Sequence, residues 1–188
     1  TLTTNVSSSA GVLLGIPYSY RFTAAVAAAS PGTFPNGQNT ITTLANGAIS
    51  VSAADIDGDG DLDVLSASID DDKIAWYAND GTGGFGGQQI ITTAANYALS
   101  VSAADLDGDG DLDVLSASFI DRKIAWYEND GSGSFSAQQI ITTAASGAFS
   151  VSTADLDGDG DLDVLSASTS DNKIAWYAND GSGSFGAQ

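Results

Sequence analysis

The sequence repeats itself every fifty residues. The segments 51–100 and 101–150 carry the same amino acid at 38 of 50 positions, and the segment 151–188 continues the pattern. A period of this length is typical of β-propeller blades and related arrays, in which each unit buries its faces only against its neighbours. Helical repeats need long stretches with a period of 3.6 residues, and these are missing. The repeat therefore favours a tandem array of short β units.

Each unit contains four short stretches with the composition of β-strands. In the first unit we predict strands at 50–54, 62–68, 73–77 and 88–94, separated by segments rich in Asp, Asn and Gly. The second and third stretches carry apolar or small residues on both faces, whereas a half-solvated sheet would alternate apolar and polar residues. A propeller blade requires burial on both faces, because each blade is sandwiched between two others. An antiparallel solenoid or a β-sandwich is the alternative.

The predicted fold is all-β, with β-propeller-type blades of four antiparallel strands in three tandem repeats. The chain divides into an N-terminal β segment or arm outside the repeat (1–33), an orphan fourth strand with its linker (34–49), a first repeat (50–99), a second repeat (100–149) and an unfinished third repeat (150–188). Closed propellers typically need about 4–8 blades. Three units therefore predict an incomplete propeller or an open array.

The composition excludes several classes of site and partner. The chain has 24 acidic residues, 5 Lys and Arg, no His and no Cys. Disulfides, zinc fingers, thiol nucleophiles and Ser-His-Asp triads are therefore excluded. The formal net charge of −19 argues against nucleic acid and anionic membrane surfaces, because both require a basic protein surface. A hydrophobic fraction of 43% distinguishes the chain from an acidic disordered tail.

Fifteen of the 24 acidic residues lie in one nine-residue loop of each unit. The spacing i, i+2, i+4, with Gly60 at position 6, is that of the start of a calcium-binding loop, in which alternate side chains turn inward around one ion. At position 7, Asp61 would offer its backbone carbonyl. An EF-hand closes with Glu at position 12, which is Ser66 here. We therefore predict that Asp63, at position 9, is the closing ligand in a bidentate contact.

Three such loops predict three sites, each holding one Ca²⁺ ion. All the available ligands are oxygens, which favours a hard cation, and many flexible carboxylates favour calcium over magnesium. A loop that supplies most of its own ligands indicates a structural ion rather than a catalytic one. The predicted metal-binding residues are Asp55, Asp57, Asp59, Asp61, Asp63, Asp105, Asp107, Asp109, Asp111, Asp113, Asp155, Asp157, Asp159, Asp161 and Asp163.

Two runs in each unit closely resemble the FG-GAP / VCBS repeat. In the second unit they are Ala-Asp-Leu-Asp-Gly-Asp-Gly-Asp-Leu-Asp-Val-Leu at 104–115 and Lys-Ile-Ala-Trp-Tyr-Glu-Asn-Asp-Gly-Ser-Gly-Ser-Phe at 123–135. The resemblance covers about residues 34–188. It implies integrin-α-like, four-stranded blades with calcium on the same aspartates, between the first and second strands. It also implies a secreted, extracellular or cell-surface protein, with roles in adhesion, surface layers or carbohydrate-associated proteins.

The two ends of the repeated region are complementary. Residues 38–43 align with the fourth strands at 88–93 and 138–143 but have no first three strands before them, and the third unit stops at 185–188, where its fourth strand would begin. One hypothesis is that the N-terminal strand of one subunit completes the last blade of the next, which gives a ring or a fibre. The alternative is that the chain is a fragment of a longer repeat protein.

We expect an extracellular, calcium-binding structural or adhesive repeat protein. Its partner is itself, in a homo-oligomer or filament, or a surface protein or glycan. The alternative function is that of a carbohydrate- or protein-binding propeller module of a larger surface protein. Such a module would use the turns at 69–72, 119–122 and 169–172, which vary between units while their flanks stay constant.

We expect neither an enzyme nor membrane insertion. A general acid or base outside the calcium loops would have to be Asp72, Asp121, Glu128 or Asp171, and nothing in the sequence pairs them. The most apolar stretch, 10–30, is interrupted by Pro and Arg, so it is a poor transmembrane helix.

Overall fold

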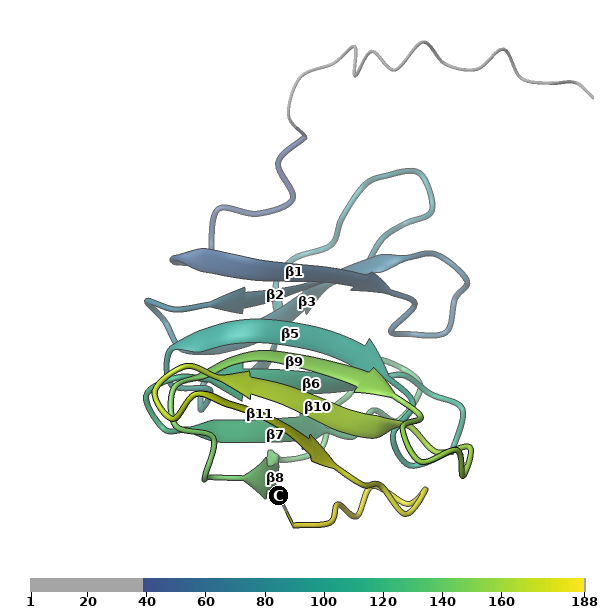
Figure 1. The fold of residues 1–188 in the computed structure, drawn as a ribbon. Helices are drawn as coiled ribbons and strands as arrows, with labels where there is room; N and C mark the ends of the chain where they lie inside the picture. Colours follow the sequence, from purple (N-terminus) through teal and green to yellow (C-terminus); the bar gives the residue numbers. More distant parts are fainter. Residues whose placement is uncertain (1–38, 188) are drawn as a thin grey trace, which may run out of the picture. The chain divides into compact units, whose positions relative to one another are not determined.

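The structure is a computed structural model that describes residues 39–187 (Figure 1). The predicted N-terminal segment 1–33, and the linker as far as residue 38, lie outside the described residues. The described part is built entirely from strands and their connections. The strands are β1 (Ala48–Ala54), β2 (Asp63–Ser68), β3 (Lys73–Tyr77), β4 (Gln89–Thr92), β5 (Ala98–Ala104), β6 (Asp113–Ser118), β7 (Lys123–Tyr127), β8 (Gln139–Thr142), β9 (Ala148–Ala154), β10 (Asp163–Ser168) and β11 (Lys173–Tyr177).

The strands form three antiparallel sheets, one for each repeat. Their orders are β1-β2-β3-β4, β5-β6-β7-β8 and β11-β10-β9, so neighbours in the sequence are neighbours in the sheet. The register is the same in each unit, with Leu65 opposite Trp76 in the first sheet and Leu115 opposite Trp126 in the second. The predicted all-β fold with four-stranded antiparallel blades is confirmed, and in the first repeat the strand ends agree with the prediction to within two residues.

In the described residues the third sheet has three strands, and no fourth strand pairs with β11 as β4 and β8 pair with β3 and β7. Within the predicted orphan fourth strand, residues 39–43 form no strand, and residue 38 lies outside the described residues. The fourth-strand position of the first sheet is already occupied by β4. Residues 39–43 therefore do not form the fourth strand of the first sheet.

Tight turns connect the strands, and some of them require unusual backbone angles. The β2–β3 hairpin places Asp72 at a φ of 56°, and Arg122 and Asn172 take the same conformation in the later hairpins. Asp and Asn tolerate this left-handed region better than most residues, and a tight hairpin demands it. The sequence variation at these turns therefore leaves the backbone path unchanged.

The hydrophobic core lies between sheets rather than within one sheet. The first core takes Ala54, Ile56, Leu65, Ala67, Ile74 and Trp76 from the first repeat and Ala95, Ala98, Val101, Val114 and Tyr127 from the second. The second core repeats it with Ala104, Leu106, Leu115, Ala117, Ile124 and Trp126 against Ala145, Ala148, Val151, Val164 and Tyr177. Each blade thus contributes one set of side chains to the preceding blade and another to the following one.

A glycine in each following blade makes room for the tryptophan of the preceding one. A Cβ added to Gly133 would collide with the indole of Trp76, and one added to Gly183 would collide with that of Trp126. Gly133 also has a φ of 77°, a conformation that side chains with a Cβ rarely adopt. Close approach and backbone angle therefore both require glycine here.

The first strands of the three sheets lie side by side, so the blades follow one another in sequence order (Figure 1). A lysine at the start of each third strand holds the entering segment. Lys73 Nζ lies 2.9 Å from Asp71 and donates to the backbone carbonyl of Leu44, and Lys123 Nζ donates equivalently to Ala94. The segment that enters the first blade is therefore positioned like the one that enters the second.

Because the core forms between blades, the same leucine should contribute differently in different repeats. Leu115 is fully buried between the second and third blades, whereas Leu165 is only half-buried on the uncovered third blade. We expect Leu115→Ala to lower the free energy of unfolding by about 2–5 kcal/mol and Leu165→Ala to lower it by much less. Urea denaturation in dilute solution measures both variants. Equal losses would contradict the interblade core.

Candidate metal centres

Each acidic loop joins the first strand of a blade to the second. In the first blade, Asp55 directly follows β1 and Asp63 is the first residue of β2. The loop turns at Gly58 and Gly60, whose φ angles are 72° and 95°. These left-handed turns suit glycine and fold the loop back on itself within nine residues. The two strands thus anchor the first and last aspartates.

The structure brings three of the five aspartates in each loop together. One carboxylate oxygen from each member of a triad lies within 4.8 Å of one from each of the others. The triads are Asp55, Asp57 and Asp63, then Asp105, Asp107 and Asp113, then Asp155, Asp157 and Asp163. Positions 1, 3 and 9 of the loop therefore converge in all three repeats.

The aspartates at positions 5 and 7 are not part of these triads. Asp59 Oδ1 accepts a hydrogen bond from the backbone N–H of Asp61 at 2.9 Å, which closes a local turn. The carboxylate of Asp61 lies against Gly81, where an added Cβ would collide with it. The predicted contributions of Asp59 and Asp61, and of Asp109, Asp111, Asp159 and Asp161, to a metal site stay predictions.

The aspartate at position 9 is fully buried and also fastens the loop. Asp63 Oδ2 accepts from the backbone N–H of Ile56 at 2.9 Å, and Oδ1 accepts from that of Asn79 at 2.8 Å. Asp113 and Asp163 make the same pair of bonds. A carboxylate oxygen has a second lone pair, so these bonds leave acceptor capacity for a cation.

Burial is the largest cause of the raised pKa values of three loop aspartates, Asp57, Asp107 and Asp113. It raises the pKa of Asp113 to about 7, with the charges of Asp107 and Asp109 adding to the effect. Burial also raises the pKa of Asp57 and Asp107, and neighbouring carboxylates raise both further. Keeping these carboxylates ionised therefore costs free energy, and a bound cation would reduce that cost.

The triads fit a calcium ion. Calcium–oxygen distances are about 2.3–2.6 Å, so two ligands of one ion lie no more than about 5 Å apart, and the oxygens of each triad meet that limit. Asp55 Oδ1 is buried and accepts no hydrogen bond, as expected for a ligand atom. The donor set consists of oxygens, which suits a hard cation.

An asparagine that the sequence analysis did not single out links each loop to the next blade. Asn129 Nδ2 donates to the carbonyl of Leu112 in its own blade at 3.0 Å and to that of Ile56 in the preceding blade at 2.8 Å. Asn179 bonds in the same way to Leu162 and Leu106. The sequence feature that could have identified this asparagine is the recurrence of Asn-Asp-Gly in every unit. The acidic loops are therefore coupled to the blade interfaces.

A hollow of about 240 Å³ lies beside this link, between the second and third blades. Its lining includes Asp105, Asp161 and Asn179. Asn179 is buried, and its Oδ1 has no hydrogen-bond partner, whereas Asn129 Oδ1 accepts from Gly133 N–H at 3.1 Å. The hollow is therefore lined by two aspartates and by a buried asparagine whose Oδ1 lacks a hydrogen-bond partner.

The four acids considered for catalysis all have structural partners. Asp72 accepts from the backbone N–H of Tyr97 at 2.7 Å. Asp121 and Asp171 pair with the lysines two residues later, at 2.8 and 3.2 Å. Glu128 accepts from the side chain of Gln139. These contacts hold hairpins and strand ends in place.

In the described part of the chain, no helix is long and apolar enough to span a membrane.

Among solved structures, the chain is similar to a lectin of Agrocybe aegerita that specifically recognises non-reducing terminal N-acetylglucosamine. The identity is 24% and the TM-score 0.55, over 73% of this chain and 36% of the lectin chain. It also matches the Tc holotoxin pore of Photorhabdus luminescens, with 23% identity and a TM-score of 0.41 over 72% of this chain and 6% of that one. No curated protein sequence matches.

The likeness to the lectin supports a propeller-like fold, and the chain spans about a third of that structure. The family comparison covers more of the sequence. The FG-GAP-like repeat matches four times, at residues 20–66, 55–116, 114–166 and 155–188. These matches extend over most of the chain and include all three acidic loops. The chain therefore belongs to the family of FG-GAP-like repeat proteins.

Proposed function

We propose that this chain is an extracellular, calcium-binding structural or adhesive module. The observation that carries the proposal is the convergence of positions 1, 3 and 9 of the acidic loop in all three repeats. Family membership supports an extracellular location. Sites of this kind in extracellular modules have dissociation constants of about 10⁻⁴–10⁻³ M, so they fill where calcium is abundant.

In this proposal Asp55, Asp57 and Asp63 and their equivalents hold the ion, which supplies positive charge to a buried carboxylate cluster. Hydrogen bonds of the chain connect each ordered loop to the neighbouring blade. The Asp113 carboxylate accepts from the backbone N–H groups of Leu106 and Asn129, and the Asn129 side chain donates to the Ile56 carbonyl in the preceding loop. Ordering one loop therefore orders its contact with the neighbouring blade.

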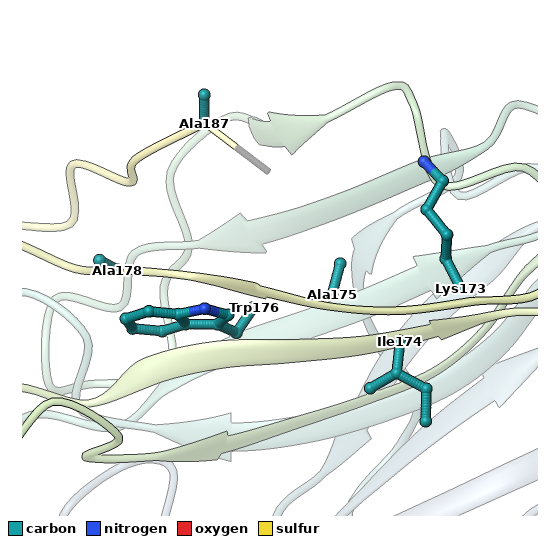
Figure 2. A pocket seen from close by; sticks show the side chains of 6 residues that line it. All are labelled: Lys173, Ile174, Ala175, Trp176, Ala178 and Ala187. Carbon is teal, nitrogen blue, oxygen red and sulfur yellow. The ribbon is translucent and has the colours of Figure 1, made fainter.

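The proposed module assembles head to tail by strand complementation. A hollow of about 310 Å³ runs along β11, lined by Lys173, Ile174, Ala175, Trp176, Ala178 and Ala187 (Figure 2). In the first blade, β4 pairs with the equivalent strand, with Gln89 opposite Trp76. Residues 40–42 of another copy align in sequence with 90–92 and would fill this edge.

The proposed role is not catalytic. The four acids that could act outside the calcium loops are engaged in the hairpin and strand contacts described above. A general acid and base would have to face a common substrate position. Their structural contacts support a scaffold instead.

Calcium binding can be tested by removing one ligand from each triad. We expect Asp57→Asn, Asp107→Asn and Asp157→Asn together to abolish calcium uptake in isothermal titration calorimetry and the rise in melting temperature on adding calcium. Position 9 is kept because it fastens the backbone. The matched control is Asp80→Asn, Asp130→Asn and Asp180→Asn, which removes the same charge from exposed turns. Uptake of three ions by the first variant would refute the assignment.

The raised pKa of Asp113 predicts how the metal-free chain responds to pH. Its carboxyl keeps a proton up to about pH 7 when folded and loses it near pH 4 when unfolded. The folded state thus binds more protons between these values, so stability falls as pH rises through this window. We expect the melting temperature in chelator to fall from pH 5 to pH 8, and the fall to be smaller in Asp113→Asn than in the exposed control Asp130→Asn. A rise with pH would contradict this.

Glycan binding is a second candidate function. It is supported by the hollow between the second and third blades with the unsatisfied Asn179 Oδ1, and by the fold of a lectin that recognises N-acetylglucosamine. Calorimetric titration with N-acetylglucosamine should detect binding that Asp161→Ala abolishes. The control Asp61→Ala changes the equivalent residue of the first blade, beside which the described residues form no preceding blade. Absence of binding, or equal loss in both variants, would exclude this site.

A further inference from the structure

Among the described residues, the three blades form two interblade cores, and no further blade covers the outer face of the first blade or of the third. On the first blade, Val51 is 72% exposed, whereas the equivalent Val101 and Val151 are 5% and 6% exposed. Ala48 is exposed in the same way and its equivalents are fully buried. We call this side of the first blade the leading face. Its residues are Ala45, Ala48, Val51 and Val64, whose equivalents the second and third blades bury. The residue equivalent to Tyr127 and Tyr177 is Tyr77, which is already buried in the first blade.

The third blade has the opposite half-core. Ile174 is 81% exposed and Trp176 44% exposed, whereas Ile74, Ile124, Trp76 and Trp126 are at most 3% exposed. Leu156 is exposed too, although Ile56 and Leu106 are buried. We call this side the trailing face. Its residues are Ala154, Leu156, Leu165, Ala167, Ile174 and Trp176.

We propose that the trailing face of one copy binds the leading face of a second copy and forms a third interblade core. The proposal rests on the head-to-tail assembly proposed above and assigns its interface. The two faces are complementary because each matches one side of an interface that the chain already forms twice. They differ from each other, so the contact is heterologous and each copy keeps one free face for the next.

Two polar contacts recur at both interblade interfaces and can be repeated between copies. Val101 N–H donates to Ser50 Oγ at 3.4 Å and Val151 N–H to Ser100 Oγ at 3.3 Å. Between copies, the same bond would join Val51 N–H to Ser150 Oγ. Likewise, Asn79 of the second copy would donate to the Leu156 carbonyl, as Asn129 does to Ile56.

The close fit between a glycine of one blade and the tryptophan of the preceding blade can also form between copies. An added Cβ at Gly133 and Gly183 meets the tryptophan of the preceding blade, but at Gly83 it meets nothing within 4 Å. Gly83 has the same left-handed conformation, with a φ of 87°. The space above Gly83 is therefore the place where Trp176 of the preceding copy would lie. A second copy satisfies the apolar, polar and steric features of both faces together.

The test blocks one face at a time. Val51→Glu blocks the leading face and Ile174→Glu the trailing face, and both side chains are exposed in the single chain, so folding should be retained. We expect the unmodified chain with calcium to form species larger than a dimer in sedimentation velocity. Each variant alone should be monomeric. An equimolar mixture should give a 1:1 complex of twice the monomer mass and nothing larger.

Two controls complete the design. Ile49→Glu and Phe149→Glu place the same charge on side chains that are exposed in the first strands but belong to neither core, and they should assemble like the unmodified chain. Thr40→Pro puts a proline at the position equivalent to Ile90, which pairs with Ala75 in the first blade, so it should weaken strand pairing while it leaves both faces intact. If this variant still assembles, the faces suffice and the proposed strand complementation is wrong.

The inference is overturned if the unmodified chain is monomeric, if the blocked variants assemble alone, or if their mixture does not form the 1:1 complex. A monomer that binds three calcium ions would leave the metal proposal standing. A chain that assembles without binding calcium would overturn the metal proposal instead.

Discussion

The burial of apolar side chains between neighbouring sheets is the interaction on which the rest of the structure depends. A single blade has no core of its own, because its two faces contribute to two different clusters. Apolar burial contributes about 25 cal/mol for each Å² removed from water, so a blade gains most of its stability from its neighbours. The regular register, the left-handed turns and the glycine beside each tryptophan all serve this stacking.

The acidic loops are part of the same design. Asp113 connects the start of its loop to Asn129, and Asn129 reaches across the interface to Ile56. A loop rich in like charges would otherwise weaken the edge of each blade by repulsion. A cation held by the triad would remove that repulsion where the blades meet, so metal binding and stacking would support each other.

Sequence patterns predicted the repeated strands well, because strands depend on spacing within one unit. The alternation of acidic residues predicted that Asp55, Asp57 and Asp63 converge. The pattern could not separate them from Asp59 and Asp61, because loop folding turns these two side chains toward local partners. The role of Asn129 was also missed, because its second acceptor lies 73 residues away in the sequence.

By itself, the sequence determined the three-unit array, the four-stranded blade and the position of the acidic loops, since all of these follow from local periodicity. Only the tertiary structure decided which copies of a repeated residue are buried. Val51 and Val101 occupy equivalent positions of the repeat, as do Trp126 and Trp176, yet one of each pair is exposed and the other is covered. The physical reason is that burial here is supplied by the neighbouring blade, and the first and third blades each lack a neighbour within the described structure.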